Sequence, residues 1–169
     1  MIRKITRRLV KTPLAGFSEI PVPLRRIYAA RGITNSSELD LGLEHLALPS
    51  TLMGIKEAAC EVADAIADEL KILVVGDFDA DGATGTALAV QALKSFGASA
   101  VDYIVPNRFD FGYGLTPEIV EVAREKDPQL IITVDNGISS VDGVTLARDY
   151  NINVIITDHH LPPSDLPPA

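Results

Sequence analysis

The stretch "KILVVGDFDADGATGTA" (residues 71–87) joins a short apolar run to an acidic turn and then to a segment rich in alanine and threonine. A continuously apolar run of this length is typical of a strand that is buried on both faces of a parallel sheet. Gly82 permits a tight turn out of the strand, and a helix is expected to follow at about residues 83–96. The stretch therefore predicts the strand, loop and helix of a βαβ unit.

Three further apolar runs continue this pattern along the chain: "AVDYIV" (100–105), "LIITV" (130–134) and "NVIIT" (153–157). Helix-like segments are expected between them, at about 116–126 and 139–149, and an amphipathic helix at 55–70 precedes the first strand. Parallel strands need crossovers of this kind, because each strand must return to the same end of the sheet. The predicted fold is an α/β domain in which helices flank a parallel, doubly wound sheet.

We expect two parts in the chain, a basic N-terminal extension at 1–54 and an α/β catalytic domain at 55–169. Prolines at 13, 21 and 23 predict little regular structure before about residue 24, so the extension is expected to be helical or irregular. Residues 1–31 hold eight Lys or Arg and one acid, whereas the rest of the chain holds 7 basic and 22 acidic residues. An acidic body disfavours nonspecific binding of nucleic acid. The basic arm is a candidate contact for nucleic acid, with a solvated tail as the alternative.

The composition indicates a cytoplasmic protein without a membrane partner. No apolar run approaches the ~18 residues that a membrane-spanning helix requires, and the N-terminus lacks the continuous apolar stretch of a signal peptide. The single cysteine, Cys60, has no partner for a disulfide, which is consistent with a reducing compartment.

Aspartates directly follow three of the four predicted strands. Asp77 and Asp79 come after the first strand, Asp135 after the third and Asp158 after the fourth. Because the carboxyl ends of parallel strands lie at one edge of a sheet, where ligands bind in such folds, these carboxylates are expected to converge. Adjacent carboxylates repel and raise each other's pKa unless a cation lies between them, so a metal ion is the simplest explanation.

Two of these motifs also have a purely structural explanation. The acidic loop after the first strand could be a polar turn in which Asp81 or Thr84 caps the helix, whose N-terminal amides could also hold a phosphate. The "DNG" run (135–137) is a common turn sequence. Taken singly, these motifs leave both interpretations open.

The "DHH" run (158–160) is harder to explain as a turn, because two histidines directly after an apolar strand need hydrogen-bond partners or a ligand. Adjacent side chains point to opposite sides of an extended chain, so one histidine is expected to ligate a metal and the other to orient the site or meet the substrate. Carboxylates combined with imidazole favour Mn²⁺, with Mg²⁺ possible and Zn²⁺ less suited. The chain has no Walker A loop, dinucleotide fingerprint or nucleophile elbow, so metal-assisted hydrolysis of a phosphoester or phosphoanhydride is the chemistry expected.

The ordered set "VVGDFDADGATGTA", "IVPNRFDFGYGL", "TVDNGIS" and "VIITDHHLP" resembles the DHH phosphoesterase superfamily. Within it, the set is most similar to the bacterial 5′→3′ exonucleases specific for single-stranded DNA, and "LRRIYAARGITNSSELD" is similar to the segment before their catalytic domain. The resemblance implies a metal-dependent phosphodiesterase of DNA repair and recombination. It also implies single-stranded DNA as substrate, with a single-stranded-DNA-binding protein and a repair helicase as partners.

The same resemblance assigns roles to individual residues. The implied ligands of Mn²⁺ or Mg²⁺, in a two-metal site, are Asp77, Asp79, Asp135 and His159. The implied supporting or phosphate-contacting catalytic residues are Asp158 and His160, while Arg108 would lie near the DNA backbone. Asp81 and Asn136 also match the motif pattern.

The chain departs from the family pattern in two places. Many members have a histidine two residues before the first aspartate, where this chain has Val75. The family also places a further metal-binding aspartate, a linking helix and a second domain well downstream of "DHH", whereas this chain ends at Ala169. We therefore expect the α/β domain to be truncated at its C-terminal end and inactive by itself.

Other functions stay open at the level of the sequence. One is a DHH-family phosphatase, or a phosphodiesterase for short oligonucleotides or cyclic dinucleotides. A second is a non-enzymatic receiver-like domain, although such domains have a lysine at a later strand end, where this chain has histidines. A third is an inactive fragment or an interaction module. Phe111 and Tyr113 could stack on bases, or could instead pack in the core or the loop.

Overall fold

The computed structural model describes residue 6 and residues 19–169, and the chain divides into two compact units, Met1–Leu52 and Met53–Ala169. The basic residues that precede residue 12, and Pro13, lie outside the described residues, so most of the candidate basic arm does too. Across the described part of the chain, no helix has both the length and the apolar character that crossing a membrane requires.

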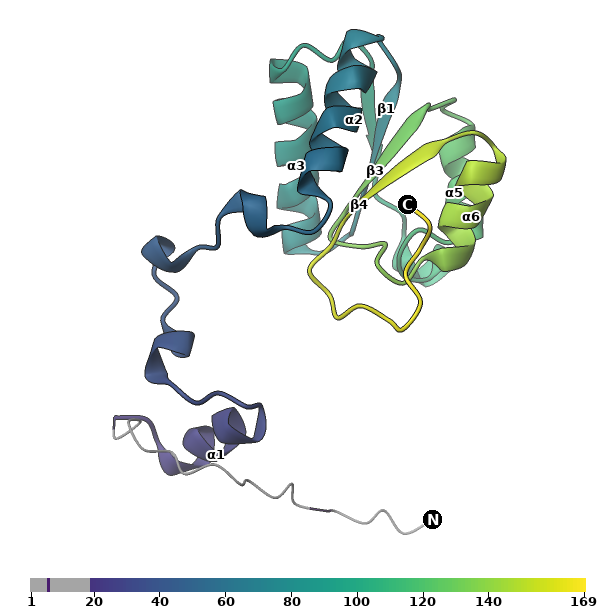
Figure 1. The fold of residues 1–169 in the computed structure, drawn as a ribbon. Coiled ribbons are helices and arrows are strands. Elements are labelled where there is room, and N and C mark those ends of the chain that lie inside the picture. Colours follow the sequence, from purple (N-terminus) through teal and green to yellow (C-terminus); the bar gives the residue numbers. More distant parts are fainter. Residues whose placement is uncertain (1–5, 7–18) are drawn as a thin grey trace, which may run out of the picture. The chain divides into compact units, whose positions relative to one another are not determined.

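Among its described residues, the first unit has one short helix and three 3-10 turns. Helix α1 spans Val22–Ala30, and the turns span Ser36–Leu39, Leu43–His45 and Pro49–Thr51 (Figure 1). The helix begins before the predicted residue 24, so that prediction was wrong. Proline is compatible with the first turn of a helix, where its missing N–H needs no intrahelical partner. From residue 19 to Leu52 the unit is helical and irregular, as expected.

The second unit contains a sheet of four strands, and all of them are parallel. The strands are β1 (Ile72–Gly76), β2 (Val101–Ile104), β3 (Leu130–Val134) and β4 (Asn153–Thr157), in the spatial order β2-β1-β3-β4. Ile72 is aligned with Val101 on one side and with Leu130 on the other, so the carboxyl ends of neighbouring strands lie at one level. The predicted parallel α/β fold is confirmed.

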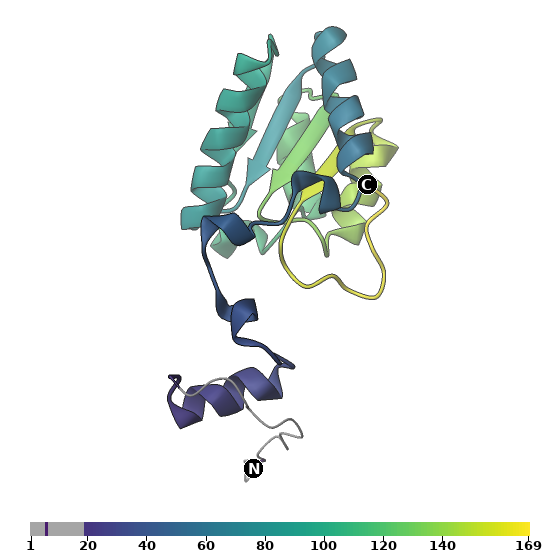
Figure 2. The ribbon, with the colours of Figure 1, turned by 60° about the vertical axis from the view of Figure 1, so that its left-hand side comes forward.

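Helices cover both faces of this sheet, as the two views show (Figures 1 and 2). Helices α2 (Ile55–Ala67) and α3 (Ala80–Ser95) pack on one face, while α5 (Pro117–Arg124) and α6 (Val141–Asp149) pack on the other. A fifth helix, α4 (Arg108–Phe111), is a single turn after β2. Alternate residues of β1 serve the two faces: Val74 packs with Ala65 and Leu93, and Val75 packs with the α5 and α6 side. Continuously apolar strands are needed because each face is buried.

The strand order reverses direction between β1 and β3. The chain moves outward from β1 to β2, and then returns to the other side of β1 to form β3 and β4. In parallel α/β sheets the crevice beyond the carboxyl ends at this reversal is the usual ligand site. The first two acidic motifs, after β1 and β3, therefore flank the position where the fold favours binding.

Candidate metal centre

The acidic loop after β1 turns directly into α3, and Asp79 is the residue that caps the helix. Its Oδ1 accepts the Gly82 N–H at 3.3 Å, and the helix begins at Ala80, earlier than the predicted residue 83. The alternative in which Asp81 or Thr84 is the cap is wrong, since Thr84 donates its hydroxyl to the Ala80 carbonyl instead. Gly82 lies within α3, where a Cβ would come within 2.5 Å of the Asp77 carbonyl oxygen, so close packing rather than a turn requires glycine there.

Asp77 is buried at the end of β1 and forms an ion pair with Arg108. The residue is 8% exposed, and its two carboxylate oxygens accept the Phe78 N–H at 2.7 Å and the Arg108 guanidinium. Arg108 also lies 3.7 Å from Asp79. The hydrogen bond to Asp77 raises the pKa of Arg108 above its usual value. Arg108 therefore neutralises part of the charge of this carboxylate pair.

Asp135 ends β3 in a backbone conformation that is rare for a residue with a side chain. Its φ is 63°, in the left-handed region, and its N–H donates to the Thr157 carbonyl at 3.0 Å. The Asp135 Oδ1 lies 2.8 Å from Nε2 of His159. Burial raises the pKa of Asp135, the hydrogen bond to His159 opposes this, and the nearby Asp81 and Asp79 raise it further. The negative charge of the Asp135 carboxylate is therefore only partly balanced by its neighbours, and a cation bound there would stabilise it.

Asn136 secures the turn beyond Asp135. Its side-chain amide donates to the carbonyls of Val75 at 3.1 Å and Val134 at 2.9 Å, which joins the ends of β1 and β3. Its own carbonyl accepts the Thr133 hydroxyl at 2.7 Å. The "DNG" run is thus a turn, as its sequence suggested, and it also fixes the carboxylate that precedes it.

Asp158 is directed inward and holds its neighbours in place. Its side chain is 1% exposed, and Oδ2 accepts the Ile138 N–H at 2.9 Å. Oδ1 accepts the His160 N–H at 3.0 Å and lies 2.7 Å from His160 Nδ1. Burial alone would raise the pKa of Asp158, but these hydrogen bonds lower it, and the same contact raises the pKa of His160. Asp158 thus connects the β3 loop to the second histidine.

Among the described residues, three groups of donor atoms meet the geometric requirement for a metal ion; one is Asp40, Glu44 and His45 in the first unit, where all three are exposed, and the other two lie at the carboxyl ends of the strands. Ligand atoms of Asp77, Asp79 and Asp135 lie within 4.8 Å of one another, and so do those of Asp135, His159 and His160. Asp135 belongs to both groups, and Asp81 lies 3.6 Å from His159. Oxygen-rich donors with imidazole suit Mn²⁺ and, for the carboxylate group, Mg²⁺. The donor set fits the implied metal, whereas Asp158 belongs to none of these groups in the described part of the chain.

Comparison with known proteins agrees with this arrangement. The model of the DHH family, N-terminal domain, matches residues 71–169. This chain belongs to the DHH family. The match begins at the strand that carries the first acidic motif and includes every strand of the sheet.

Bacterial exonucleases are among the proteins that are similar to this chain. The chain is 53% identical over 146 residues to the single-stranded-DNA-specific exonuclease RecJ of Haemophilus influenzae, which covers 86% of this chain and 25% of that protein. It is 51% identical over 152 residues to RecJ of Escherichia coli, covering 90% of this chain and 26% of that protein. The chain therefore spans about a quarter of the length of these relatives.

Solved structures of DHH proteins share the fold. A crystal structure of exonuclease RecJ bound to manganese matches 73% of this chain and 31% of that chain, with a TM-score of 0.65 and 40% sequence identity. The RecJ of Thermus thermophilus in complex with Mn²⁺ matches 83% of this chain and 19% of that chain, with a TM-score of 0.61 and 35% identity.

One contributor to this DHH site was not assigned to it from the sequence, namely the Tyr113 hydroxyl. It lies 2.9 Å from His160 Nδ1 and 3.2 Å from the Asp135 carbonyl, which it can reach as a donor. Burial, followed by the charges of Asp158 and Asp77, raises the pKa of Tyr113 to about 12. The "GYG" run indicated a loop but gave no sign of this contact, because the partner is distant in the sequence. Phe111, by contrast, packs against the core.

The position two residues before Asp77, where the resemblance implies a histidine in many relatives, is buried here. Val75 is 1% exposed and packs in the core on the α5 and α6 side of the sheet. Its side chain cannot supply a ligand atom, so the carboxylates and the "DHH" histidines supply the donors.

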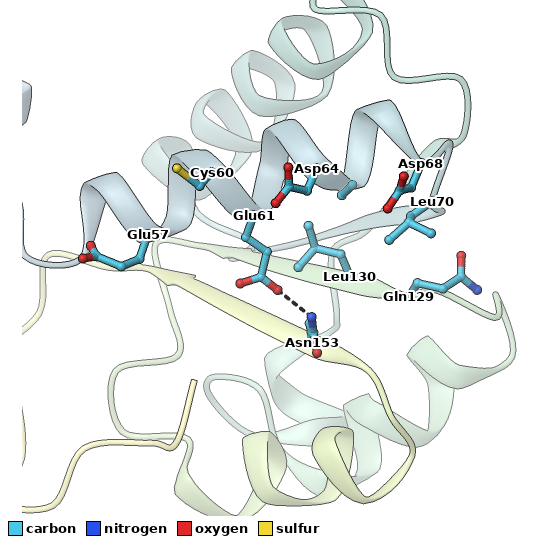
Figure 3. A pocket seen from close by; sticks show the side chains of 10 residues that line it. Glu57, Cys60, Glu61, Asp64, Asp68, Leu70, Gln129, Leu130 and Asn153 are labelled. Carbon is cyan, nitrogen blue, oxygen red and sulfur yellow. Dashed lines mark hydrogen bonds between the residues drawn. The ribbon is translucent and has the colours of Figure 1, made fainter.

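A second acidic region of this DHH domain lies at the opposite end of the sheet. A groove of about 490 Å³ opens between α2 and the first residues of β3 and β4 (Figure 3). Its acids are Glu57, Glu61, Asp64 and Asp68, all from α2 or its C-terminal end, and the exposed thiol of Cys60 lies among them. Glu61 accepts a hydrogen bond from the Asn153 side chain at 2.7 Å. No sequence motif predicted this groove.

Proposed function

We propose that this chain is the metal-binding part of a 5′→3′ exonuclease that hydrolyses phosphodiester bonds in single-stranded DNA. The observation that carries the proposal is the meeting of three carboxylates and a histidine at the reversal point of the sheet. The RecJ names of relatives that are 51% and 53% identical support the choice of substrate. The resemblance also supports a role in DNA repair in the cytoplasm, beside a single-stranded-DNA-binding protein and a helicase.

Asp77, Asp79, Asp135 and His159 would hold Mn²⁺ or Mg²⁺ in this proposal. When bound, such ions lower the pKa of water and stabilise the charge that develops on a phosphate. The pre-existing geometry supports the assignment, since these side chains already meet without rearrangement of the strands.

Arg108 has two roles in this proposal. Its guanidinium pairs with Asp77, a carboxylate that would hold a metal ion. Its planar donors are also suited to a phosphate oxygen, so Arg108 would bind the DNA backbone beside the metal ligands. Phosphate binding by an acidic domain needs such a local cation, because the body of the protein repels DNA.

Asp158, His160 and Tyr113 act as a connected set beside the metal ligands. The carboxylate of Asp158 orients the ring of His160 and favours its protonated form. A protonated His160 can donate to a phosphate oxygen or protonate a leaving group. Tyr113 keeps the ring next to Asp135 through its hydroxyl.

The proposal includes a dependence on residues outside this chain. Because the chain spans about a quarter of its RecJ relatives, we propose that residues 1–169 bind metal but do not turn over DNA by themselves. Two proteins test this: the chain alone, and a chimera in which the chain replaces the matching residues of Haemophilus influenzae RecJ. The chimera is expected to digest 5′-labelled single strands with Mn²⁺, and Asp79→Ala is expected to abolish digestion.

The outcomes separate the alternatives. Digestion of dinucleotides only would replace the exonuclease with a short-oligonucleotide phosphodiesterase, and release of phosphate from monoesters only would indicate a phosphatase. A stable aspartyl phosphate after treatment with a small phosphodonor would indicate a receiver-like domain. Robust digestion by the chain alone, lost in Asp79→Ala, would contradict the proposed dependence on other residues.

A further inference from the structure

Two phenylalanines are exposed beside the acidic site. Phe78 lies between Asp77 and Asp79 in the loop after β1, and Phe109 follows Arg108 in α4. Phe78 is 45% exposed and Phe109 is 88% exposed. Their ring centroids are 6.3 Å apart in an edge-to-face arrangement. An apolar surface of two aromatic rings thus borders the carboxylates.

Neither ring contributes to the buried core of the unit. Both hydrophobic clusters of the sheet form without Phe78 and Phe109, whereas the nearby Phe111 packs against one of them. The exposure of Phe109 follows from its backbone: the Asn107 side chain accepts the Phe109 N–H at 3.1 Å and donates to Asp110 at 2.7 Å. A capped turn therefore holds the ring outward, where it contributes little to folding.

Arg108 connects this aromatic pair to the site. Its guanidinium carbon lies 4.4 Å from the centroid of the Phe78 ring, while one of its nitrogens pairs with Asp77. A phosphate that contacts Arg108 would therefore have its own nucleoside within reach of the rings. Uncharged bases are not repelled by the surrounding acids, and every base has a flat π-face that stacks on aromatic side chains.

We propose that Phe78 and Phe109 form a stacking site for a nucleobase of the strand whose phosphate reaches Arg108. The inference rests on the proposed function, because it takes the ligand to be single-stranded nucleic acid. Stacking of this kind tolerates any base, so the site contributes affinity and positions the strand without selecting a sequence.

The chain contains no tryptophan, so a single substitution gives a specific fluorescent probe. Phe109→Trp keeps an aromatic face, and its emission is expected to fall saturably when a short 5′-phosphorylated single strand is added with Mg²⁺. Phe96→Trp is the matched control, since Phe96 is 71% exposed and lies after the far end of α3. Its emission is expected to stay constant.

Affinity gives a second readout. Phe109→Leu and Phe78→Leu are expected to weaken strand binding by the full chain and to raise the KM of the RecJ chimera, each by about 5- to 150-fold, the range implied by loss of one stacked base. Phe109→Trp is expected to restore binding, and Phe96→Leu to leave it unchanged. Melting of each variant near the wild-type temperature shows that folding is intact.

Each outcome separates the stacking site from the proposed function. Digestion of single strands by the chimera, with an unchanged KM in Phe109→Leu and constant emission from the Phe109→Trp variant, overturns the stacking site alone. Quenching of the Phe109→Trp variant by a single strand without digestion by the chimera overturns the exonuclease and keeps the stacking site. If the strand causes no quenching and the chimera does not digest DNA, both the stacking site and the exonuclease are overturned. Quenching by an added peptide instead of DNA overturns the stacking site, because it assigns the rings to a protein contact.

Discussion

The two acidic regions at opposite ends of the sheet use the same residue types in opposite surroundings. At the carboxyl end, Asp77 and Asp135 are each 8% exposed and have fixed partners in Arg108 and His159. At the amino end, the acids Glu57, Asp64 and Asp68 are exposed, and Glu61 has a hydrogen bond to Asn153. The number of acids therefore does not distinguish a metal site from a solvated surface.

The difference lies in what holds each carboxylate. Exposed acids on one helix can turn away from one another into water, so their repulsion is screened. Acids at strand ends are fixed by the sheet, and burial makes an unpaired charge expensive. A bound cation therefore stabilises the buried carboxylates at the carboxyl end of the sheet, whereas it would stabilise the exposed acids at the amino end only slightly.

The largest expected effect is the loss of metal binding on Asp135→Asn. Asp135 belongs to both donor groups at the carboxyl ends of the strands, so Mn²⁺ affinity of the chain should fall by at least about 100-fold, more than the loss of an outer partner typically causes. Isothermal titration with Mn²⁺ measures this. Glu61→Gln makes the same acid-to-amide change in the groove and should leave the affinity unchanged. An equal loss of Mn²⁺ affinity in the two variants would contradict the distinction between the two acidic regions.

Asp158→Asn tests a carboxylate that touches the ligands without belonging to their group. Loss of its charge should weaken Mn²⁺ binding by about 10- to 100-fold, because outer partners orient metal ligands. The pKa of His160 should fall toward its ordinary value, since the Asp158 carboxylate is what raises it. NMR titration of the histidine ring protons in metal-free protein follows that change. An unaltered His160 pKa would argue against the orienting contact.

Arg108→Gln tests whether the buried carboxylate of Asp77 needs the positive charge of Arg108 for stability. The metal-free protein should lose about 1–2 kcal/mol, equivalent to about 2–8 °C in Tm, because Asp77 is left buried without its partner. Saturating Mn²⁺ should recover most of this loss, since the metal replaces the missing charge. Differential scanning calorimetry with and without Mn²⁺ gives both values. A decrease that Mn²⁺ does not reduce would assign Arg108 a purely structural role.

The smallest effect concerns an acid that is exposed yet paired. Lys126 donates to Asp102 at 2.7 Å and holds the pKa of Asp102 below its usual value. A lowered pKa stabilises the fold at pH above the unfolded value of about 3.9, and this contribution is lost as pH falls through the lowered pKa.

The Asp102 contribution should be below about 1 kcal/mol, because solvent screens exposed pairs. Comparison of Lys126→Gln with the wild type should show a slightly lower Tm at neutral pH and no difference once the pH lies below the lowered pKa. Asp64→Asn, which removes the charge of an exposed acid in the groove, is the control and should leave the Tm at neutral pH unchanged. A difference that persists in acid would assign Lys126 a role independent of Asp102.

The sheet and the acidic edge were predictable because both depend on local patterns. Continuous apolar runs define strands that are buried on two faces, and an aspartate after a strand can only lie at the carboxyl edge. The start of α3 was missed because Asp79, taken only as a ligand, also caps the helix. A side chain can do both, and the pattern of acids does not reveal which.

The contacts that complete the site were not predictable, because they join distant segments. Arg108 reaches Asp77 across 31 positions and Tyr113 reaches His160 across 47. The inward direction of Asp158 likewise depends on the Ile138 amide of the neighbouring loop. Such contacts follow from how loops of adjacent strands pack together, which no short motif specifies.

The left-handed backbone conformation of Asp135 lowers the stability of the fold, while the side chain at this position is needed for metal binding. Such a conformation costs a residue with a side chain about 1–3 kcal/mol, and glycine adopts it freely. Asp135→Gly should therefore raise the melting temperature of the metal-free chain while it removes the shared ligand. A library of this chain enriched only for heat resistance should lose the aspartate at this position early, and one enriched for metal binding should keep it.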